Sequence, residues 1–354
     1  RWTMQKVMRE MGIMMTGGSS SVKDLWLPLR EAAAMAKAAI LLGDKYKLGD
    51  PLTYKLKEAK DFNLLGKPTL RTDTASKVNG SAAFGIDAVA PDGKQPDFYA
   101  AVLMSPARSG SVAKVDSKAA IVLQPNINGS GTSGGVALVA KTYWQAKKAL
   151  DGVKIEWAVG GDSAWSNDTV MQALRTALDT ESGFTFYRKG DAKTAIEKIA
   201  LVQASSSKAS QPIRLSVAYS APYLAHATME PMNATVSLAG KGAARKAIIT
   251  VGSQVPDLAR AAAAKALGLD KESVTVVVPY LGGGFGRRLE VDIVAQAATI
   301  AATHFGADGE GTLQVIWSRE ADMQHDFYRP AAMAKFDAAL DASGNITAWV
   351  NQSA

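Results

Sequence analysis

Short apolar runs, many of them rich in Val and Ile, recur along this chain and are typical of β-strands. They predict strands at 82–86, 98–104, 114–116, 137–140, 153–157, 213–220, 233–238, 247–251, 274–278, 312–318, 335–340 and 346–351. Between these runs, the spacing of apolar and small residues predicts helices at 24–42, 142–150, 166–180, 191–200, 256–267 and 291–302. The last two strands are expected to pair as a hairpin across 341–344. The pattern as a whole predicts an α+β fold.

The predicted elements group into five segments. Residues 1–43 hold a Gly/Ser stretch and the first long helix, and residues 44–65 form a lysine-rich linker. Residues 66–160 form a compact unit of short strands, residues 161–205 a helical linker, and residues 206–354 a second strand-rich region. The chain starts without Met, its long helix stops abruptly before a charged loop, and its last strands belong to a sheet that looks unfinished. We therefore expect a fragment, with residues missing near 43–44 and after 354.

One stretch stands out as a candidate ligand site: a strand is followed by Tyr-Leu-Gly-Gly-Gly-Phe-Gly-Arg-Arg at 280–288 and then by a helix. We call residues 282–288 the glycine turn. Its glycines let the backbone adopt positive φ and let a ligand approach closely, and a strand–turn–helix presents bare N–H groups to an anion. The alternative is a tight turn without a ligand. The stretch is not a P-loop, because no Gly-Lys-Ser/Thr follows, and Arg287 replaces the third glycine of a dinucleotide fingerprint.

A second cluster of small residues, Thr-Gly-Gly-Ser-Ser-Ser at 16–21, precedes the first long helix. We call it the serine turn. Small hydroxyl residues in this position are first of all helix N-caps. The same glycines and hydroxyls also suit a second anion-binding turn. The sequence leaves both interpretations open.

Composition and charge narrow the range of chemistry. The 354 residues include no cysteine, which excludes a disulfide, a thiolate zinc site and an iron–sulfur cluster held by this chain. Three widely spaced histidines make a metal held by protein side chains a poor expectation. The formal charge of +7 suits an anionic ligand, but the basic residues are scattered and lack interleaved aromatic residues, which argues against nucleic acid. No apolar run is long enough to span a membrane.

Together with the glycine turn, three further stretches carry a family resemblance: 223–234, which contains Met229-Glu230-Pro231, then 251–257, and 324–330. They resemble the large subunit of the molybdenum hydroxylases, the xanthine oxidase and aldehyde oxidase family. Residues 16–30 and 66–87 look most like one branch of it. That branch comprises the isoquinoline 1-oxidoreductase beta subunit and the membrane-bound aldehyde dehydrogenases of acetic acid bacteria. The resemblance extends in order over nearly the whole chain.

This resemblance implies a domain plan and a cofactor. Residues 66–160 would form an α/β hammerhead domain, and residues 1–43 and 206–354 would belong to molybdopterin-binding domains of mixed sheets and helices. Molybdenum would be held by the dithiolene of a pterin, in bacteria often as molybdopterin cytosine dinucleotide. No side chain of this chain is therefore expected to bind the metal.

The resemblance also assigns roles within the turns. The Phe285 N–H would donate to an oxygen on molybdenum, and Gln254 would approach a second oxygen, which makes these two the expected catalytic residues. Gln254 could instead cap the helix that starts near Pro256. The expected cofactor-binding residues are Gly282, Gly283, Gly284, Phe285, Gly286 and Arg287 near the pterin, and Gly17, Gly18, Ser19, Ser20 and Ser21 near the dinucleotide phosphates.

Family members hydroxylate an electrophilic carbon with oxygen from water, using a glutamate base in a Gly-x-Gly-Glu-Pro motif that this sequence does not contain. We expect that glutamate beyond residue 354. Leu289 stands where purine-oxidising members often have glutamate, which favours an aldehyde or an N-heterocycle as substrate. His226, Glu230 and Arg329 are further expected substrate-pocket residues. His226 could equally be structural, and Arg329 could pair with Asp326.

The expected partners follow from the same resemblance. Electrons would leave through a small 2Fe–2S subunit, because this chain has no cysteine for a cluster, and a cytochrome c subunit is a further expected partner. The expected location is a periplasmic, membrane-associated complex, with the cytoplasm as the alternative. A non-catalytic binding module with a degenerate molybdopterin fold is the rival function.

Overall fold

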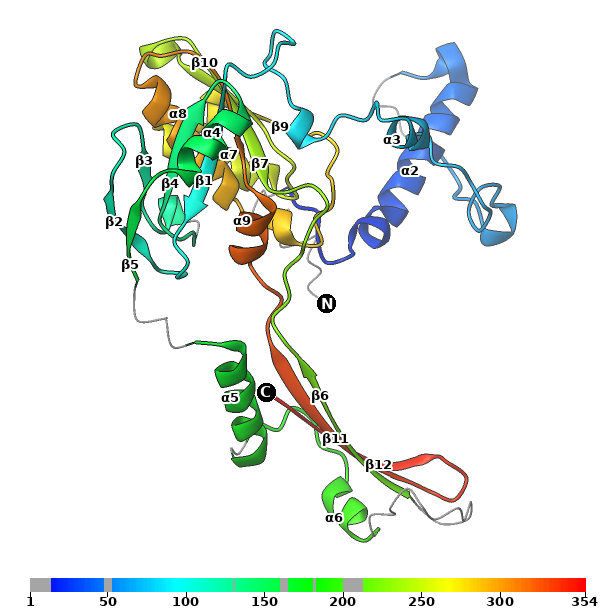
Figure 1. Ribbon diagram of the computed structural model, residues 1–354. Coiled ribbons are helices and arrows are strands. Elements are labelled where there is room, and N and C mark those ends of the chain that lie inside the picture. The colour runs from blue at the N-terminus through cyan, green and yellow to red at the C-terminus, as the bar shows by residue number, and fades with distance from the viewer. Residues whose placement is uncertain (1–13, 48–52, 130, 160–164, 181–182, 200–212) are drawn as a thin grey trace. The chain divides into compact units, whose positions relative to one another are not determined.

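The computed structural model describes residues 14–47, 53–129, 131–159, 165–180, 183–199 and 213–354 (Figure 1). The chain divides into two compact units. Unit 1 comprises 1–158 and 227–325, and unit 2 comprises 159–226 and 326–354.

Unit 1 is built on a seven-stranded sheet with the order β3-β4-β1-β10-β7-β8-β9. Strand β1 runs parallel to β10 and β8 parallel to β9, while the remaining neighbours are antiparallel. The sheet thus joins strands from the segments 66–160 and 206–354. Its strands are β1 (Phe98–Met104), β3 (Ile121–Leu123), β4 (Gly135–Ala140), β7 (Asn233–Ala239), β8 (Lys246–Thr250), β9 (Val274–Val277) and β10 (Gly311–Ile316).

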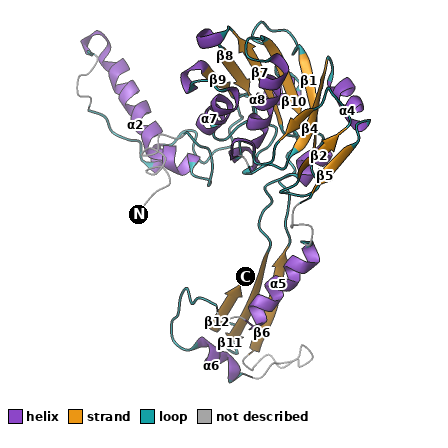
Figure 2. Cartoon of the chain, turned by 90° about the vertical axis from the view of Figure 1, so that its left-hand side faces the viewer, coloured by secondary structure: helices purple, strands orange, loops and turns teal. Residues whose placement is uncertain are grey.

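Helices cover both faces of this sheet (Figure 2). The pair α7 (Pro256–Leu267) and α8 (Asp292–Phe305) packs on one face, and its many buried alanines let the helices approach closely. On the other face, α4 (Tyr143–Asp151) forms a smaller cluster with β1 and β4. Alternation along β1 serves both layers: Ala100 belongs to the first cluster and Ala101 to the second.

Smaller elements complete unit 1. Strands β2 (Ser111–Val115) and β5 (Ile155–Ala158) pair as a two-stranded sheet. Short helices in loops include α3 (Thr74–Val78), α9 (Arg319–Gln324) and, among several 3-10 turns, the one at Gly85–Asp87. Helix α2 (Ser21–Leu42) buries no side chain completely.

Unit 2 contains a three-stranded antiparallel sheet with the order β12-β11-β6. Its strands are β6 (Ile213–Ala221), β11 (Ala332–Leu340) and β12 (Ile346–Ser353). Helices α5 (Asn167–Thr180) and α6 (Ala192–Glu197) pack on this sheet, with Ile196 buried against Ala339 and Ala348. The predicted hairpin is confirmed, since the Gly344 N–H donates to the Asp341 carbonyl at 3.0 Å between β11 and β12.

The strand predicted at 82–86 is wrong. Only Phe84 forms a single bridge there, with Tyr280, and the chain then enters the 3-10 turn Gly85–Asp87. The Asp87 side chain accepts a hydrogen bond from the Phe84 N–H at 3.0 Å, so a local turn replaces strand pairing. Strand β3 and helices α3 and α9 were not expected.

Candidate functional site

The glycine turn and the serine turn, more than two hundred residues apart in sequence, are joined through Gln254. Its main chain accepts from the Thr16 N–H at 2.8 Å and donates to the Arg288 carbonyl at 2.9 Å. Its side-chain amide donates to the Thr16 carbonyl at 2.8 Å and accepts from the Gly286 N–H at 3.2 Å. One residue therefore sets the spacing between the two turns.

The glycine turn presents consecutive unpaired amides. Among the described residues, the N–H groups of Gly283, Gly284 and Phe285 have no hydrogen-bond partner. Gly283 and Gly286 have φ near 103° and 108°, and Phe285, a non-glycine residue, has φ 55°. Such a backbone is strained and persists where the surroundings hold it, often at ligand sites. The Phe285 side chain is 78% exposed, so packing of the ring does not explain the strain.

Gly284 differs from its neighbours, because its φ lies outside the left-handed region. A larger residue there would displace the Gln254 side chain. A Cβ atom at this position would lie 2.9 Å from Gln254 Oε1, closer than real Cβ contacts allow. The glycine turn and the Gln254 amide therefore fit each other closely.

The serine turn has similar features. Gly18 and Ser19 have φ of 63° and 53°, and the N–H groups of Gly17, Gly18 and Ser19 have no partner among the described residues. The capping interpretation is wrong for Ser20: it makes no side-chain cap bond to α2, and its hydroxyl donates to the Gly17 carbonyl at 3.1 Å. Ser21 is the first residue of α2. The serine turn therefore brings its free amides next to the N-terminus of α2, an arrangement that suits an anion.

The alternative role of Gln254 as a helix cap is also wrong. Val255 is the N-cap of α7 and no side chain caps that helix. The nearest local bond runs from the Val255 N–H to Ser253 Oγ at 3.0 Å. The Gln254 amide is used between the two turns instead.

Two arginines of the glycine turn are buried and paired. Arg287, expected to contact the cofactor, directs its guanidinium to both carboxylate oxygens of Asp292, at 2.9 and 2.6 Å, and stacks over Trp317. Arg288 pairs with Glu230 at 2.8 Å. Direct contact of the Arg287 guanidinium with an anion therefore requires rearrangement, and its contribution here is to hold the turn against α8.

Glu230, expected near the substrate pocket, is buried. Its carboxylate receives hydrogen bonds from Arg288, from the Gly282 and Ile86 N–H groups and from Asn233, all within the protein. Leu289 is half-buried, and its side chain would contact a Cβ placed on Gly17.

His226 and Arg329 belong to unit 2 and have local partners. His226 Nδ1 lies 2.9 Å from Asp326 Oδ1, and its main-chain N–H also donates to that carboxylate. This geometry fits an ordered histidine. Arg329 donates to the Pro222 carbonyl at 2.7 Å, so a carbonyl takes the place of the Asp326 pairing that the sequence left open.

The residues that hold the loop before Glu230 were not predicted from the sequence. Ala227 has φ 48°. Arg319 donates to the carbonyls of Thr228 at 2.6 Å and Met229 at 2.9 Å and pairs with Asp322. A short charged cluster after strand β10 was the only available signal for this contact.

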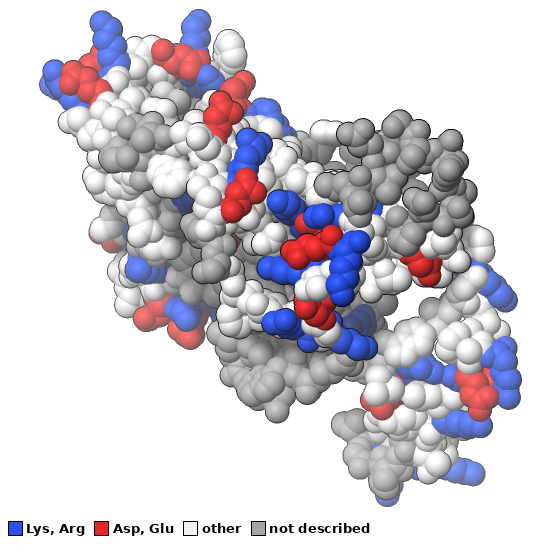
Figure 3. All heavy atoms as spheres, turned by 90° about the horizontal axis from the view of Figure 1, so that it is seen from below, with Lys and Arg blue, Asp and Glu red and all other residues white. Residues whose placement is uncertain are grey.

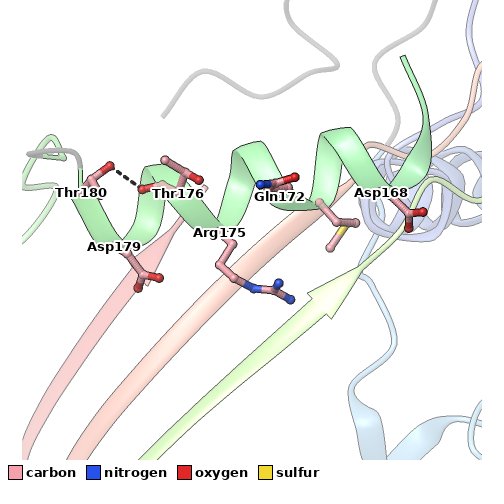
Figure 4. A pocket seen from close by; sticks show the side chains of 7 residues that line it. Asp168, Gln172, Arg175, Thr176, Asp179 and Thr180 are labelled. Atoms are coloured by element: carbon pink, nitrogen blue, oxygen red, sulfur yellow. Dashed lines mark hydrogen bonds between the residues drawn. The ribbon is translucent and has the colours of Figure 1, made fainter. Parts of the chain in front are cut away.

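Two hollows lie away from these turns. One, of about 150 Å³, lies near α4 and α9 and is lined in part by His325, whose pKa burial lowers from 6.5 to about 4. The other, of about 530 Å³, is lined among the described residues by side chains of α5, including Arg175, Asp168 and Asp179 (Figure 4). Neither contains a residue predicted for the site.

The surface charge and the clusters of ionisable side chains do not point to a particular ligand. Acidic and basic side chains are interspersed on the face shown in Figure 3. In the described part of the chain, no three His, Asp or Glu side chains are grouped to bind a metal ion. No helix there combines the length and apolarity needed to cross a membrane. Counted over the described residues, the two turns offer six main-chain N–H groups without a partner, which suits an anionic, oxygen-rich ligand.

Comparison with known proteins connects this surface to molybdenum enzymes. Residues 180–353, which include the glycine turn, match the family described as molybdopterin cofactor-binding domain. The chain is 29% identical over 289 residues to isoquinoline 1-oxidoreductase subunit beta of Brevundimonas diminuta, which covers 80% of this chain and 34% of that protein. It is 26% identical over 390 residues to the membrane-bound aldehyde dehydrogenase (pyrroloquinoline-quinone) of Gluconacetobacter polyoxogenes, covering 97% and 48%.

A third relative, the aldehyde oxidoreductase molybdenum-binding subunit PaoC of Escherichia coli K12, is 25% identical over 82% of this chain and 40% of its own. The chain thus spans between a third and a half of the length of these curated relatives.

Solved structures share the fold. Quinoline 2-oxidoreductase from Pseudomonas putida 86 superposes with a TM-score of 0.51 at 17% identity, covering 81% of this chain and 39% of that one. Carbon monoxide dehydrogenase from Oligotropha carboxidovorans gives 0.54 at 14% identity, with 81% and 39% covered. Aldehyde oxidoreductase from Desulfovibrio gigas gives 0.52 at 15%, with 80% and 33% covered. The predicted α+β class with mixed sheets is confirmed.

Proposed function

We propose that this chain, which belongs to the molybdenum hydroxylase family, holds the pterin cofactor of a molybdenum oxidoreductase along its two joined turns. The observation that carries the proposal is the set of unpaired N–H groups on the glycine turn and the serine turn, bridged by Gln254. The domain match over 180–353 supports the same cofactor.

The residues present fit such a group. Phosphates and pterin oxygens are acceptors, and consecutive main-chain amides at positive φ form a concavity that binds them. Glycine at 282–284 brings the backbone to the surface without side chains in the way. When bound, the molybdenum cofactor supplies two-electron oxidation chemistry to the site. No side chain of this chain needs to bind the metal.

The chain's own residues would position the cofactor. The Phe285 N–H, held at positive φ, would donate to an oxygen at the metal end. Gln254 Nε2 donates one hydrogen to Thr16, and its second N–H would donate to another oxygen there. The N–H groups of Gly17, Gly18 and Ser19, with the N-terminus of α2, would hold the phosphates of a cytosine dinucleotide form. Fixed donors of this kind need no reorganisation during the reaction.

We further propose that the complete enzyme oxidises an aldehyde or an N-heteroaromatic carbon with oxygen from water. The names of the relatives support both substrate classes. Leu289 gives an apolar contact where a charged residue would suit a purine. The name of the Gluconacetobacter relative specifies pyrroloquinoline-quinone, but the domain match favours molybdopterin for this chain.

Electrons would pass to a small 2Fe–2S subunit and on to a cytochrome c subunit, because this chain has no cysteine for a cluster. The word membrane-bound in one relative's name supports a membrane-associated complex, which we place in the periplasm. We retain the domain plan of a hammerhead domain at 66–160 and cofactor domains at 1–43 and 206–354 as part of the proposal.

The test is to purify the complete natural polypeptide with its partner subunits and to assay benzaldehyde and isoquinoline with an artificial electron acceptor. We expect turnover of at least one of them and incorporation of ¹⁸O from labelled water into the product. Acid hydrolysis of the cofactor should release CMP. A folded complex that binds neither pterin nor molybdenum would identify a non-catalytic module and overturn the proposal.

A further inference from the structure

We infer that the buried pair of Glu230 and Arg288 is a positioning device that fixes the free amides of the glycine turn. The inference rests on the proposed function for its ligand, but its geometry can be tested without the ligand. It assigns to the Met229-Glu230-Pro231 stretch a role in supporting the cofactor surface from behind.

Arg288 donates hydrogen bonds to three carbonyls, one in the glycine turn and two in neighbouring loops. Its Nε donates to the Gly283 carbonyl at 2.7 Å, and its terminal nitrogens donate to the carbonyls of Glu230 at 3.0 Å and Gly252 at 3.4 Å. A peptide group is planar, so fixing the Gly283 carbonyl also fixes the direction of the Gly284 N–H. That N–H is one of the unpaired donors.

Glu230 holds the two preceding peptide groups of the turn, on either side of Gly282. Its Oε2 accepts from the Gly282 N–H at 2.9 Å and from Arg288 at 2.8 Å, and its main-chain N–H donates to the Gly282 carbonyl at 3.0 Å. Its Oε1 accepts from the Ile86 N–H at 2.9 Å and from Asn233 at 3.0 Å. The carboxylate therefore ties the turn to the loop at 85–87 and to the start of β7.

Close packing explains why Gly282 must be glycine. A Cβ placed on Gly282 would lie 2.3 Å from the Cβ of Glu230, so the turn rests directly on that side chain. A movement of Glu230 is thus transmitted to the backbone that carries the free amides.

Burying the charges of Glu230 and Arg288 costs desolvation free energy, so fold stability alone does not explain this pair. The Arg288 side chain is 0% exposed and that of Glu230 is 7% exposed, and burial lowers the pKa of Arg288 despite the nearby carboxylate. Buried ion pairs are often no more stabilising than apolar residues of the same volume. The two side chains make five hydrogen bonds to main-chain groups of the turn and its supports, and the geometry that these bonds fix explains the pair better.

The turn contains its own matched control. Arg287 and Asp292 form a second ion pair, with both side chains 1% exposed, that joins the adjacent residue to the first residue of α8. Removing one charge from either pair leaves its buried partner uncompensated, so both changes should destabilise the fold. Only the first pair bonds directly to Gly282 and Gly283.

The experiment compares Glu230→Gln with Asp292→Asn, and Arg288→Lys with Arg287→Lys, in the full chain. Amide hydrogen exchange without cofactor reports on the Gly282 N–H, and molybdenum content per folded chain reports on the site. We expect faster exchange at Gly282 only in the Glu230 and Arg288 variants, and a loss of bound molybdenum per folded chain that is about tenfold or more in these variants and larger than in the Arg287 and Asp292 variants. Arg288→Lys keeps the charge and provides the test if Glu230→Gln does not fold.

Equal exchange at Gly282 in the matched variants, or molybdenum losses in both pairs that follow stability alone, would overturn the inference. If the wild-type chain binds no molybdenum, the proposed function fails, while the exchange comparison still decides whether this pair positions the turn.

Discussion

The fit between Gly284 and Gln254 gives a quantitative prediction for Gly284→Ala. The new Cβ would lie 2.9 Å from Gln254 Oε1 and 3.5 Å from its Cδ, so the side-chain amide must move. Its bonds to the Gly286 N–H and the Thr16 carbonyl, at 3.2 and 2.8 Å, are then weakened or lost.

The expected cost follows from those two bonds. Each neutral hydrogen bond contributes about 0.5–1.5 kcal/mol net, so losing both costs about 1–3 kcal/mol. The φ of Gly284 is accessible to alanine, and the loss of unfolded-state entropy returns about 0.4–1 kcal/mol. We expect a net destabilisation of roughly 0.5–2 kcal/mol.

A double-mutant cycle in urea unfolding, followed by tryptophan fluorescence, isolates the clash. In a Gln254→Ala background, Gly284→Ala should become neutral or slightly stabilising, which is a coupling of about 1 kcal/mol or more. Gly17→Ala is the control, because its Cβ would make only ordinary contacts, with the nearest atom at 3.7 Å. Additive effects of the two changes would refute the reasoning.

Three further predictions concern the same chain. Burial lowers the pKa of His325 to about 4, so the fold is most stable above about pH 6.5, where this side chain is neutral in both the folded and the unfolded chain. Up to roughly 3 kcal/mol of unfolding free energy is then lost as the pH falls from 6.5 through 4. His325→Gln should flatten the pH dependence of urea unfolding over that range, and an unchanged slope would contradict the assignment. The purified chain should contain no stoichiometric iron, which elemental analysis checks; one or two iron atoms per chain would place the cluster here. In the loaded complex, Gln254→Ala should lower turnover by about 10²–10³ because an oriented donor is lost, with molybdenum content measured on the same sample; normal turnover per molybdenum would remove Gln254 from the reaction.

Elements with strong local signals were predicted closely. The bounds of α7 match because Pro256 is pre-organised for the first turn and Gly268, at φ 65°, ends the helix. Strand β1 matches because its apolar run, flanked by polar residues, fills both layers of the core. The strand predicted at 82–86 was wrong because this segment forms a tight 3-10 turn that packs against the Asn233 side chain and does not pair with a neighbouring strand.

The two ligand turns were found from their glycines and hydroxyls, but their contact was not. Nothing local in Thr16 or Gln254 indicates that these residues share hydrogen bonds across more than two hundred residues. The same holds for Glu230 and Arg288, whose charges look like ordinary surface residues in the sequence. Long-range pairing of polar groups is set by the packed fold, and a single sequence carries little signal for it.

The molybdenum and pterin content of the folded protein is the most direct test of the two turns as a cofactor site. It should be measured on protein made in cells that also load a second molybdenum enzyme as a positive control. We predict one molybdenum atom and one pterin per chain, both lost together in Gly284→Val. A folded wild-type protein with neither, beside a fully loaded control enzyme, would contradict the assignment of the two turns as a cofactor site.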